Sequence, residues 1–275
     1  MTVWFTKGYR NLYNAISDLK KEHPEINVLC SHSDKLFSGF YSADFSEFEP
    51  KFKNKEHFLS FTKEMIQKYD VKLIIPHYKQ EWFNEFKSFF DGLGVVVATV
   101  AGKNKVNAIN NKGKFYSNIS KIKGVNSPEF RIFRNYEEFL DGKKQLKNKF
   151  ELCIKPSVGV YGSDFYKLSD VNKSKLNKVI SRNKTMLLMQ FLDGFEYSAD
   201  CVAKNGQLIG FVVRKKLSPN EPQVVVNNQS INDQVQLLVK ELNLNGLFNI
   251  QFKEYQGTPF VLEINPRLSG RSYYA

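Results

Sequence analysis

One stretch near the C-terminal end restricts the fold and the chemistry of this chain more than any other. It reads FVLEINPRLSGR and spans residues 260–271. Residues 260–264 are apolar except for Glu263, which is typical of a short buried strand. A buried carboxylate without a partner is costly, so Glu263 requires a cation or strong hydrogen-bond donors. Asn265 lies two residues further on and therefore faces the same side of the strand.

These side chains suggest a metal site beside a phosphate site. A carboxylate and an amide oxygen at a strand end suit Mg2+, a hard ion that takes oxygen ligands. Pro266 ends the strand, and Arg267 and Arg271 follow within one loop, where both can pair with phosphate in a fork geometry. The combination favours a nucleoside-triphosphate site. The alternative, a structural salt bridge between Glu263 and Arg267, stays open.

The composition limits the remaining classes of protein. A chain of 275 residues is long enough for two ordinary domains or one large one. It has no apolar run of the roughly 18–20 residues needed to span a bilayer, and its N-terminus lacks the features of a signal peptide, so we expect a cytoplasmic protein. Cys30, Cys153 and Cys201 are far apart in apolar runs, which predicts buried free thiols.

The formal charge of +12 raises the question of nucleic acid as a partner. The lysines, however, are spread along the whole chain, with no arginine-rich arm and no zinc-finger spacing. Nucleic-acid binding is therefore not favoured. An anionic substrate or a nucleotide accounts for part of the excess charge.

The first hundred residues alternate between strand and helix patterns. Strands are expected at 3–5, 26–30, 71–75 and 95–99, with amphipathic helices in the segments between them at 12–23, 58–69 and 82–90. Such alternation predicts an α/β fold in which helices cover both faces of a parallel sheet. Thr6-Lys7-Gly8 follows the first strand, but we interpret it as an ordinary turn.

A lysine at the end of a strand marks the next candidate site. After a helix at 104–119, a strand at 129–133 and a helix at 136–146, the strand 150–156 contains Lys155. It leads into a loop of small residues whose backbone N–H groups can approach phosphate oxygens, with Lys155 as a point charge. The spacing is not that of a Walker A motif. A β-hairpin with a snorkelling lysine is the open alternative.

The last part of the chain predicts a nucleotide-binding linker and an antiparallel sheet. The strand 186–192 runs into a short linker whose backbone can meet an adenine edge, and Glu196 can accept from ribose hydroxyls unless it is simply an exposed glutamate. A hairpin at 197–216 turns at Asn205-Gly206 and ends in a basic cluster, 214–216, which either reaches an anionic substrate or is a solvated edge. A helix begins with Ser230 as its cap. Strand 247–252 then brings Gln251 opposite Glu263.

In this order, these features resemble the ATP-grasp superfamily, particularly the branch related to the carbamoyl-phosphate synthase large subunit and to carboxylate–amine ligases. The resemblance covers nearly the whole chain, and its most specific part is the 263–267 motif preceded by 249–252. It implies a Rossmann-like pre-ATP-grasp domain at 1–103. A first, lid-side α+β subdomain at 104–188 and a second, metal-binding subdomain at 189–275 would follow.

The resemblance also implies a role for each candidate residue. The side chains that would contact ATP phosphates are Lys112 and Lys155, under a closing loop that contains Gly159, Gly162 and Ser163. The residues that would form the adenine hinge are Gln190, Phe191 and Leu192, with Glu196 on the ribose. The ligands of one or two Mg2+ ions, for which Mn2+ can substitute, would be Gln251, Glu263 and Asn265. Arg267 and Arg271 would stabilise the transferring phosphoryl group and the acyl phosphate.

The chain departs from the family pattern in several respects. Asn111 stands where the family often has Asp, the 159–163 loop has only two glycines, and Gln251 stands where many members have an acid. Relatives usually continue past the position of Ala275 into structure that shapes the acceptor site, so we expect a minimal or trimmed member.

The implied activity is that of an ATP- and Mg2+-dependent ligase. It would activate a small carboxylate, such as an amino acid, a peptide or another metabolite, as an acyl phosphate and join it to an amine. Two alternatives stay open: carbamoyl-phosphate-type phosphorylation of bicarbonate or carbamate, and a non-catalytic ATP-binding switch module. We expect small-molecule partners and no membrane partner, and a homodimer by analogy with most relatives.

Overall fold

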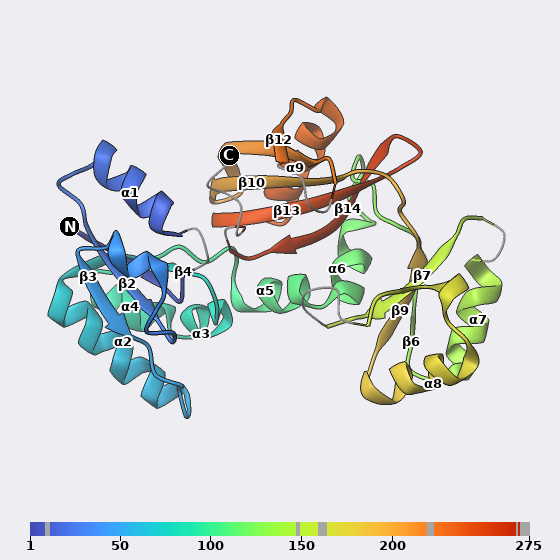
Figure 1. Ribbon diagram of the computed structural model, residues 1–275, viewed down its shortest axis with the longest axis horizontal. Helices are drawn as coiled ribbons and strands as arrows, with labels where there is room; N and C mark the ends of the chain where they lie inside the picture. The colour runs from blue at the N-terminus through green and yellow to red at the C-terminus, as the bar shows by residue number, and fades with distance from the viewer. Residues whose placement is uncertain (9–11, 147–148, 159–163, 219–222, 268, 270–275) are drawn as a thin grey trace.

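The computed structural model describes residues 1–8, 12–146, 149–158, 164–218, 223–267 and 269. Three sheets follow one another along the long axis of the molecule (Figure 1). The first, near the N-terminus, is parallel, and the other two are antiparallel. Among the described helices, none has the length and apolar character needed to cross a membrane.

The N-terminal sheet has the strand order β3-β2-β1-β4-β5. Its strands are β1 (Thr2–Thr6), β2 (Asn27–His32), β3 (Phe45–Phe48), β4 (Val71–Pro76) and β5 (Val96–Val97). Alternate residues of β1 enter different cores: Trp4 packs with α2 (Lys55–Tyr69), whereas Val3 and Phe5 pack with α1 (Leu12–Glu22). Helices therefore cover both faces of a parallel sheet, and this prediction is confirmed.

Three details of this first part differ from the sequence prediction. Between β2 and α2, where no helix or strand was predicted, lie the 3-10 helix η1 (Ser38–Tyr41) and the edge strand β3, whose half-exposed residues hide its strand pattern. The helix expected at 82–90 is two short helices, α3 (Gln80–Glu85) and α4 (Lys87–Gly92), because Phe86 leaves helical geometry with ψ at 22°. The last strand keeps only two residues, 96 and 97.

The central sheet is antiparallel with the order β12-β11-β10-β13-β14. Its strands are β10 (Glu196–Lys204), β11 (Gln207–Lys216), β12 (Gln223–Val225), β13 (Gly246–Tyr255) and β14 (Thr258–Asn265). Apolar residues of one face, such as Ile250 and Ile264, form the largest core with α5 (Lys103–Asn110), α6 (Lys112–Ile119) and α9 (Gln229–Glu241). The opposite face is thereby left for polar side chains.

Two helix predictions near this sheet were wrong. The helix expected at 104–119 breaks into α5 and α6 at Asn111, whose ψ of 103° is extended. The Asn111 side chain caps α6 by accepting from Lys114 N. Helix α9 is capped by Asn228 and not by Ser230, since the Asn228 side chain accepts from Ile231 N.

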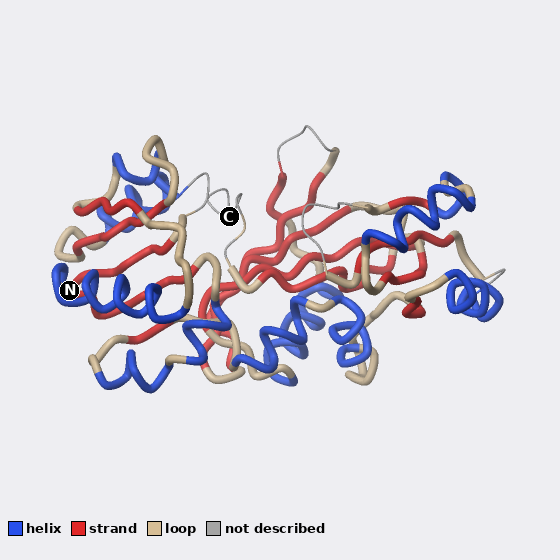
Figure 2. The backbone as a smooth tube through the Cα atoms, turned by 90° about the horizontal axis from the view of Figure 1, so that it is seen from below, coloured by secondary structure: helices blue, strands red, loops and turns tan. Residues whose placement is uncertain are grey.

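The third sheet is small and has the order β6-β9-β7-β8. Its strands are β6 (Phe130–Phe133), β7 (Leu152–Pro156), β8 (Tyr166–Lys167) and β9 (Met186–Gln190). A separate core joins them to α7 (Tyr136–Leu146) and α8 (Lys173–Arg182), with the 3-10 helix η2 (Leu168–Asp170) after β8. Figure 2 shows this part beyond one end of the central sheet and the N-terminal part beyond the other. The exact domain boundaries stay a prediction.

The three cysteines are free and buried, which confirms their prediction. Burial raises the pKa of the Cys30 and Cys153 thiols to about 12, so both stay protonated at neutral pH.

Candidate functional site

Two rungs of the central sheet carry the predicted metal ligands. Gln251 of β13 pairs directly with Glu263 of β14, and on the next rung Asn249 pairs with Asn265. The residues between them, Ile250 and Ile264, point into the core, so all four polar side chains share the opposite face. The register of one hairpin therefore gathers three amide side chains and one carboxylate on one face of the sheet.

A bulge in β14 adjusts this register. The pairing moves from Gln251↔Glu263 to Phe252↔Val261, which leaves Leu262 as the extra residue. Without the bulge, Val261 and Glu263 would face the same side of the sheet, so Val261 could not enter the core while Glu263 faces Gln251. The Glu263 side chain keeps 30% exposure, and its Oε1 accepts from Asn265 Nδ2 at 3.3 Å.

The donor set of these rungs fits a hard cation. Gln251, Glu263 and Asn265 offer only oxygen ligands to a metal, which is the chemistry that Mg2+ prefers. In the described part of the chain no three His, Cys, Asp or Glu gather, so amide oxygens have to complete this set. One rung on, Asn249 Oδ1 is buried and has no hydrogen-bond partner among the described residues, so this face has an acceptor to spare.

Two lysines approach the carboxylate from outside the sheet. Lys112, at the start of α6, has its Nζ 3.5 Å from Glu263 Oε2. Lys155, near the end of β7, donates to the hydroxyl of Tyr116 at 2.9 Å. Burial lowers the pKa of both lysines, while the charge of Glu263 opposes that shift. An anion with several negative charges would stabilise both cations here.

Ser157 fixes the start of α6 against the end of β7. Its carbonyl accepts from Lys112 N at 2.8 Å, and its hydroxyl donates to Asn111 Oδ1 at 2.9 Å. Asn111 is therefore both the N-cap of α6 and the acceptor for the Ser157 hydroxyl. These contacts bring together Lys112 and Lys155, which are 43 residues apart in the chain.

The predicted adenine hinge follows β9. The backbone N–H groups of Gln190 and Phe191 already donate to the carbonyls of Glu129 and Glu151, at 2.9 and 2.8 Å. Leu192 is buried, and Phe191 is half-buried, with Lys167 Nζ 4.2 Å from its ring centroid. Recognition of adenine by this segment would have to use its other backbone groups.

Glu196, predicted to hold ribose, lies between two lysines. Its carboxylate accepts from Lys216 Nζ at 3.0 Å and from Lys253 Nζ at 3.3 Å. Burial alone would raise the pKa of Glu196, but the two lysines lower it below its ordinary value. A ribose would therefore meet a charged carboxylate that already has donors.

Arg267 follows β14, at the place where this strand meets the N-terminal part of the molecule. It lines a cavity together with Thr6 and His77, which stand at the carboxyl ends of β1 and β4. Gln80 donates from its side chain to the Pro266 carbonyl and accepts from Val100 N, which ties this turn to the first domain. Burial and the charge of Arg267 lower the pKa of His77 to about 4.

Several predicted residues lie outside the described part of the chain. They are Gly159, Gly162, Ser163 and Arg271.

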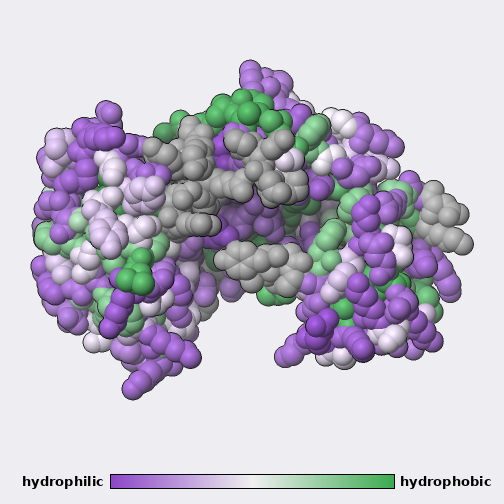
Figure 3. Space-filling model, in the orientation of Figure 1, coloured by the Kyte–Doolittle hydropathy of each residue, from purple (hydrophilic) through white to green (hydrophobic). Residues whose placement is uncertain are grey.

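On the face seen in Figure 3, the surface is hollowed between the two lateral parts of the molecule, and hydrophilic residues are visible in the hollow.

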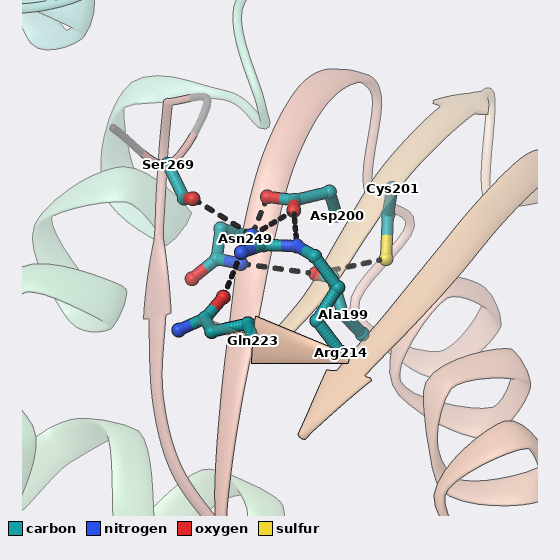
Figure 4. A network of polar contacts seen from close by, with 7 residues as sticks. All are labelled: Ala199, Asp200, Cys201, Arg214, Gln223, Asn249 and Ser269. Carbon is teal, nitrogen blue, oxygen red and sulfur yellow. Dashed lines mark hydrogen bonds and ion pairs between the residues drawn. The ribbon is translucent and has the colours of Figure 1, made fainter. Parts of the chain in front are cut away.

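The sequence analysis did not predict the buried polar network beside the Asn249–Asn265 pair. Arg214 is fully buried, and its guanidinium donates to Asp200, to Gln223 and, at 2.9 Å, to the hydroxyl of Ser269 (Figure 4). The second oxygen of Asp200 accepts from Asn249 Nδ2 at 3.0 Å. Because Arg214 is fully buried, it neither belongs to a solvated edge nor is exposed to a substrate in this structure. Because side chains alternate along a strand, Asn249 shares a face with Gln251, and Asp200 shares a face with Glu196. The sequence alone could therefore have placed Asp200 and Asn249 on the polar face of the sheet.

Comparison with known proteins agrees with this geometry. Residues 182–275 match a family model described as "ATP-grasp in the biosynthetic pathway with Ter operon". N5-carboxyaminoimidazole synthetase from Staphylococcus aureus, in complex with ADP, superimposes on 99% of this chain and 72% of its own, with a TM-score of 0.75 and 13% identity.

The chain has an ATP-grasp fold. L-amino acid ligase from Bacillus licheniformis is a second structure of this shape, with a TM-score of 0.68, 15% identity, and coverage of 98% of this chain and 67% of the ligase. In sequence, the ATP-grasp chain is 26% identical over 177 residues to the carbamoyl phosphate synthase large chain of Thermoanaerobacter sp. (strain X514). That match covers 56% of this chain and only 16% of the synthase chain.

Proposed function

We propose that this ATP-grasp chain binds ATP with Mg2+ and acts as an ADP-forming ligase that joins a small carboxylate to an amine. The observation that carries the proposal is the meeting of oxygen donors and cations at one place. Glu263 and Gln251 form one rung, Asn265 stands on the next, and Lys112 Nζ lies 3.5 Å from Glu263. The cytoplasm, expected from the sequence, is part of the same proposal.

The residues would divide the work as follows. Gln251, Glu263 and Asn265 would hold Mg2+, which supplies positive charge to offset that of the β- and γ-phosphates. Lys112 and Lys155 would bind phosphate oxygens, and Arg267 would face the γ-phosphate from the side of the cavity.

The reaction needs little covalent chemistry from the protein. A carboxylate oxygen attacks the γ-phosphorus, and ADP leaves with the electrons of the broken bond. The amine nitrogen then attacks the acyl carbon, and phosphate leaves after the amine loses a proton. Cationic side chains that are already in position speed both steps by stabilising the negative charge that develops in each transition state.

Two alternatives predict different substrates or none. Similarity to carbamoyl phosphate synthase favours phosphorylation of bicarbonate, which would require ammonia as the amine. A switch module would bind the nucleotide without turnover.

Turnover tests the proposal. ADP release would be measured with Mg2+ and ATP across a matrix of amino acids and small carboxylates against amines and ammonia, with bicarbonate as a separate row. We expect release that depends on one carboxylate and one amine together. Bicarbonate-dependent release with ammonia would favour the synthase-type reaction. Nucleotide binding without release in any well would favour the switch module.

A matched pair of variants separates chemistry from binding. Arg267→Ala should reduce ADP release by about a hundredfold or more, the usual effect of losing one charge that stabilises the transition state. Its affinity for ADP with Mg2+ should change by less than about threefold, roughly 0.7 kcal/mol. Arg182→Ala, at a position 61% exposed, is the control and should leave both unchanged.

A further inference from the structure

The hydroxyl of Tyr116 contacts both Lys155 and the backbone of β14. Tyr116 lies in α6 and is fully buried. Its hydroxyl lies 2.6 Å from the Leu262 carbonyl and 2.9 Å from Lys155 Nζ. A hydroxyl has one hydrogen to donate, and a carbonyl can only accept. The Tyr116 hydrogen therefore points to Leu262, and the hydroxyl oxygen accepts from Lys155.

The carbonyl that Tyr116 reaches is a special one. Leu262 is the bulge residue, without a partner in the register of β13, and it stands directly before Glu263. A bulge re-aims neighbouring side chains, and its extra residue has no partner in the ladder to hold it. The hydroxyl of Tyr116 therefore holds the backbone at the point that sets the direction of the Glu263 side chain.

The same hydroxyl keeps one cation in a fixed position. Lys155 is partly buried, and Glu263 is a carboxylate whose charge acts on it. Lys112 already lies 3.5 Å from that carboxylate. If Lys155 lost its neutral acceptor, Glu263 would be the strong acceptor available to it. A second ammonium on Glu263 would compete with a divalent cation for the same oxygens.

We propose that Tyr116 is a positioning residue, which holds Lys155 and the Leu262 bulge so that Glu263 stays available to Mg2+. This inference rests on the proposed nucleotide function. It assigns Tyr116 no contact with the nucleotide. Through one hydroxyl, it adds a contact shared by three elements, α6, β7 and β14.

The test is the affinity for ADP, measured by calorimetry without Mg2+ and at a series of Mg2+ concentrations. Tyr116→Phe removes only the hydroxyl and preserves the volume of the buried ring. We expect it to weaken ADP binding about tenfold at low Mg2+, which is about 1.4 kcal/mol. At high Mg2+ the affinity of the variant for ADP should return to that of the wild type. Without Mg2+, the two affinities should differ by less than threefold. Tyr69→Phe is the control, since that hydroxyl bonds to Glu47 within the N-terminal domain.

A second background isolates the lysine. In Lys155→Met, Tyr116 keeps its bond to Leu262 but has no ammonium to hold. Adding Tyr116→Phe there should raise the Mg2+ requirement clearly less than it does in the wild type. Equal effects in the two backgrounds, an equal loss with and without Mg2+, or a Tyr116→Phe variant that binds like the wild type would each overturn the inference. A wild type that binds no ADP at any Mg2+ concentration would instead remove the proposed function, and the inference with it.

Discussion

Gln251 and Glu263 are direct cross-strand partners in the hairpin of β13 and β14. Opposite residues of an antiparallel pair have their Cβ atoms about 4.5–5.5 Å apart, so an amide and a carboxylate here can share one cation. The pairing places a neutral amide directly opposite the carboxylate. The strength of metal binding should therefore depend on the charge at position 251.

Replacing Gln251 by Glu should strengthen the metal site. A second carboxylate on the same rung adds a negative ligand, so the Mg2+ concentration needed for half-maximal ADP binding should fall several-fold. Gln251→Leu removes the ligand and should raise it. The measurement is calorimetry at fixed ADP with increasing Mg2+. Equal Mg2+ requirements in all three proteins would mean that position 251 does not contact the metal.

The ion pair between Asp200 and Arg214 should be essential for stability. Asp200→Asn leaves a fully buried guanidinium beside a neutral amide, and the free energy of unfolding should fall by about 3–5 kcal/mol. Urea denaturation measures the change. The double variant Asp200→Leu/Arg214→Met removes both charges and should recover much of the loss.

Asp141→Asn is the matched control for that prediction. Asp141 is 71% exposed and lies 3.9 Å from Lys144, so the substitution should change stability by less than about 0.5 kcal/mol. A loss below 1 kcal/mol for Asp200→Asn would contradict a buried, mutually dependent pair.

The carboxyl of Glu49 should make stability fall as pH rises. Glu49 is 2% exposed and accepts from the Ser31 hydroxyl, and its burial raises its pKa from 4.5 to about 7. Between these pH values the folded protein keeps a proton that the unfolded chain has released, so the stabilisation present below pH 4.5 is lost by pH 7. The loss is about 3 kcal/mol at 1.36 kcal/mol per pKa unit.

Glu49→Gln isolates this contribution, because the amide cannot ionise. Relative to the wild type, the variant should gain stability between pH 4.5 and pH 8, as followed by urea denaturation at each pH. His77 has the opposite sign: its pKa is lowered to about 4, so its contribution is lost as pH falls below 6.5. Since both proteins contain His77, the difference between them cancels it. A difference that stays constant with pH would contradict the raised pKa.

The sequence predicts the sheet and helix pattern best where one face of an element is regularly buried. The alternation along β13 and β14 predicts that Gln251 faces Glu263, and the structure has this pairing. The stripe of helix α7 predicts its bounds, Tyr136–Leu146, without error. Both depend on regular burial of one face, which periodicity measures directly.

The network around Arg214 was missed for a physical reason. Arginine at a strand end is usually solvated, and nothing local distinguishes Arg214 from the neighbouring Lys215 and Lys216. Its burial depends on Asp200, Gln223 and Ser269, which lie on other elements. The break at Asn111 was missed similarly, because only the contact with Ser157 shows why the helix stops there.

The central claim is that one nucleotide site joins Lys155, from the small sheet, and Glu263, from the central sheet. Calorimetric titration of the wild type, Glu263→Gln and Lys155→Ala with ATP and Mg2+ tests it most directly, with Lys149→Ala, at a position 53% exposed, as the control. We predict that the wild type and the control bind equally, and that each site variant loses about tenfold or more in affinity, at least about 1.4 kcal/mol. Undiminished binding by both site variants, or no binding by the wild type, would contradict the account.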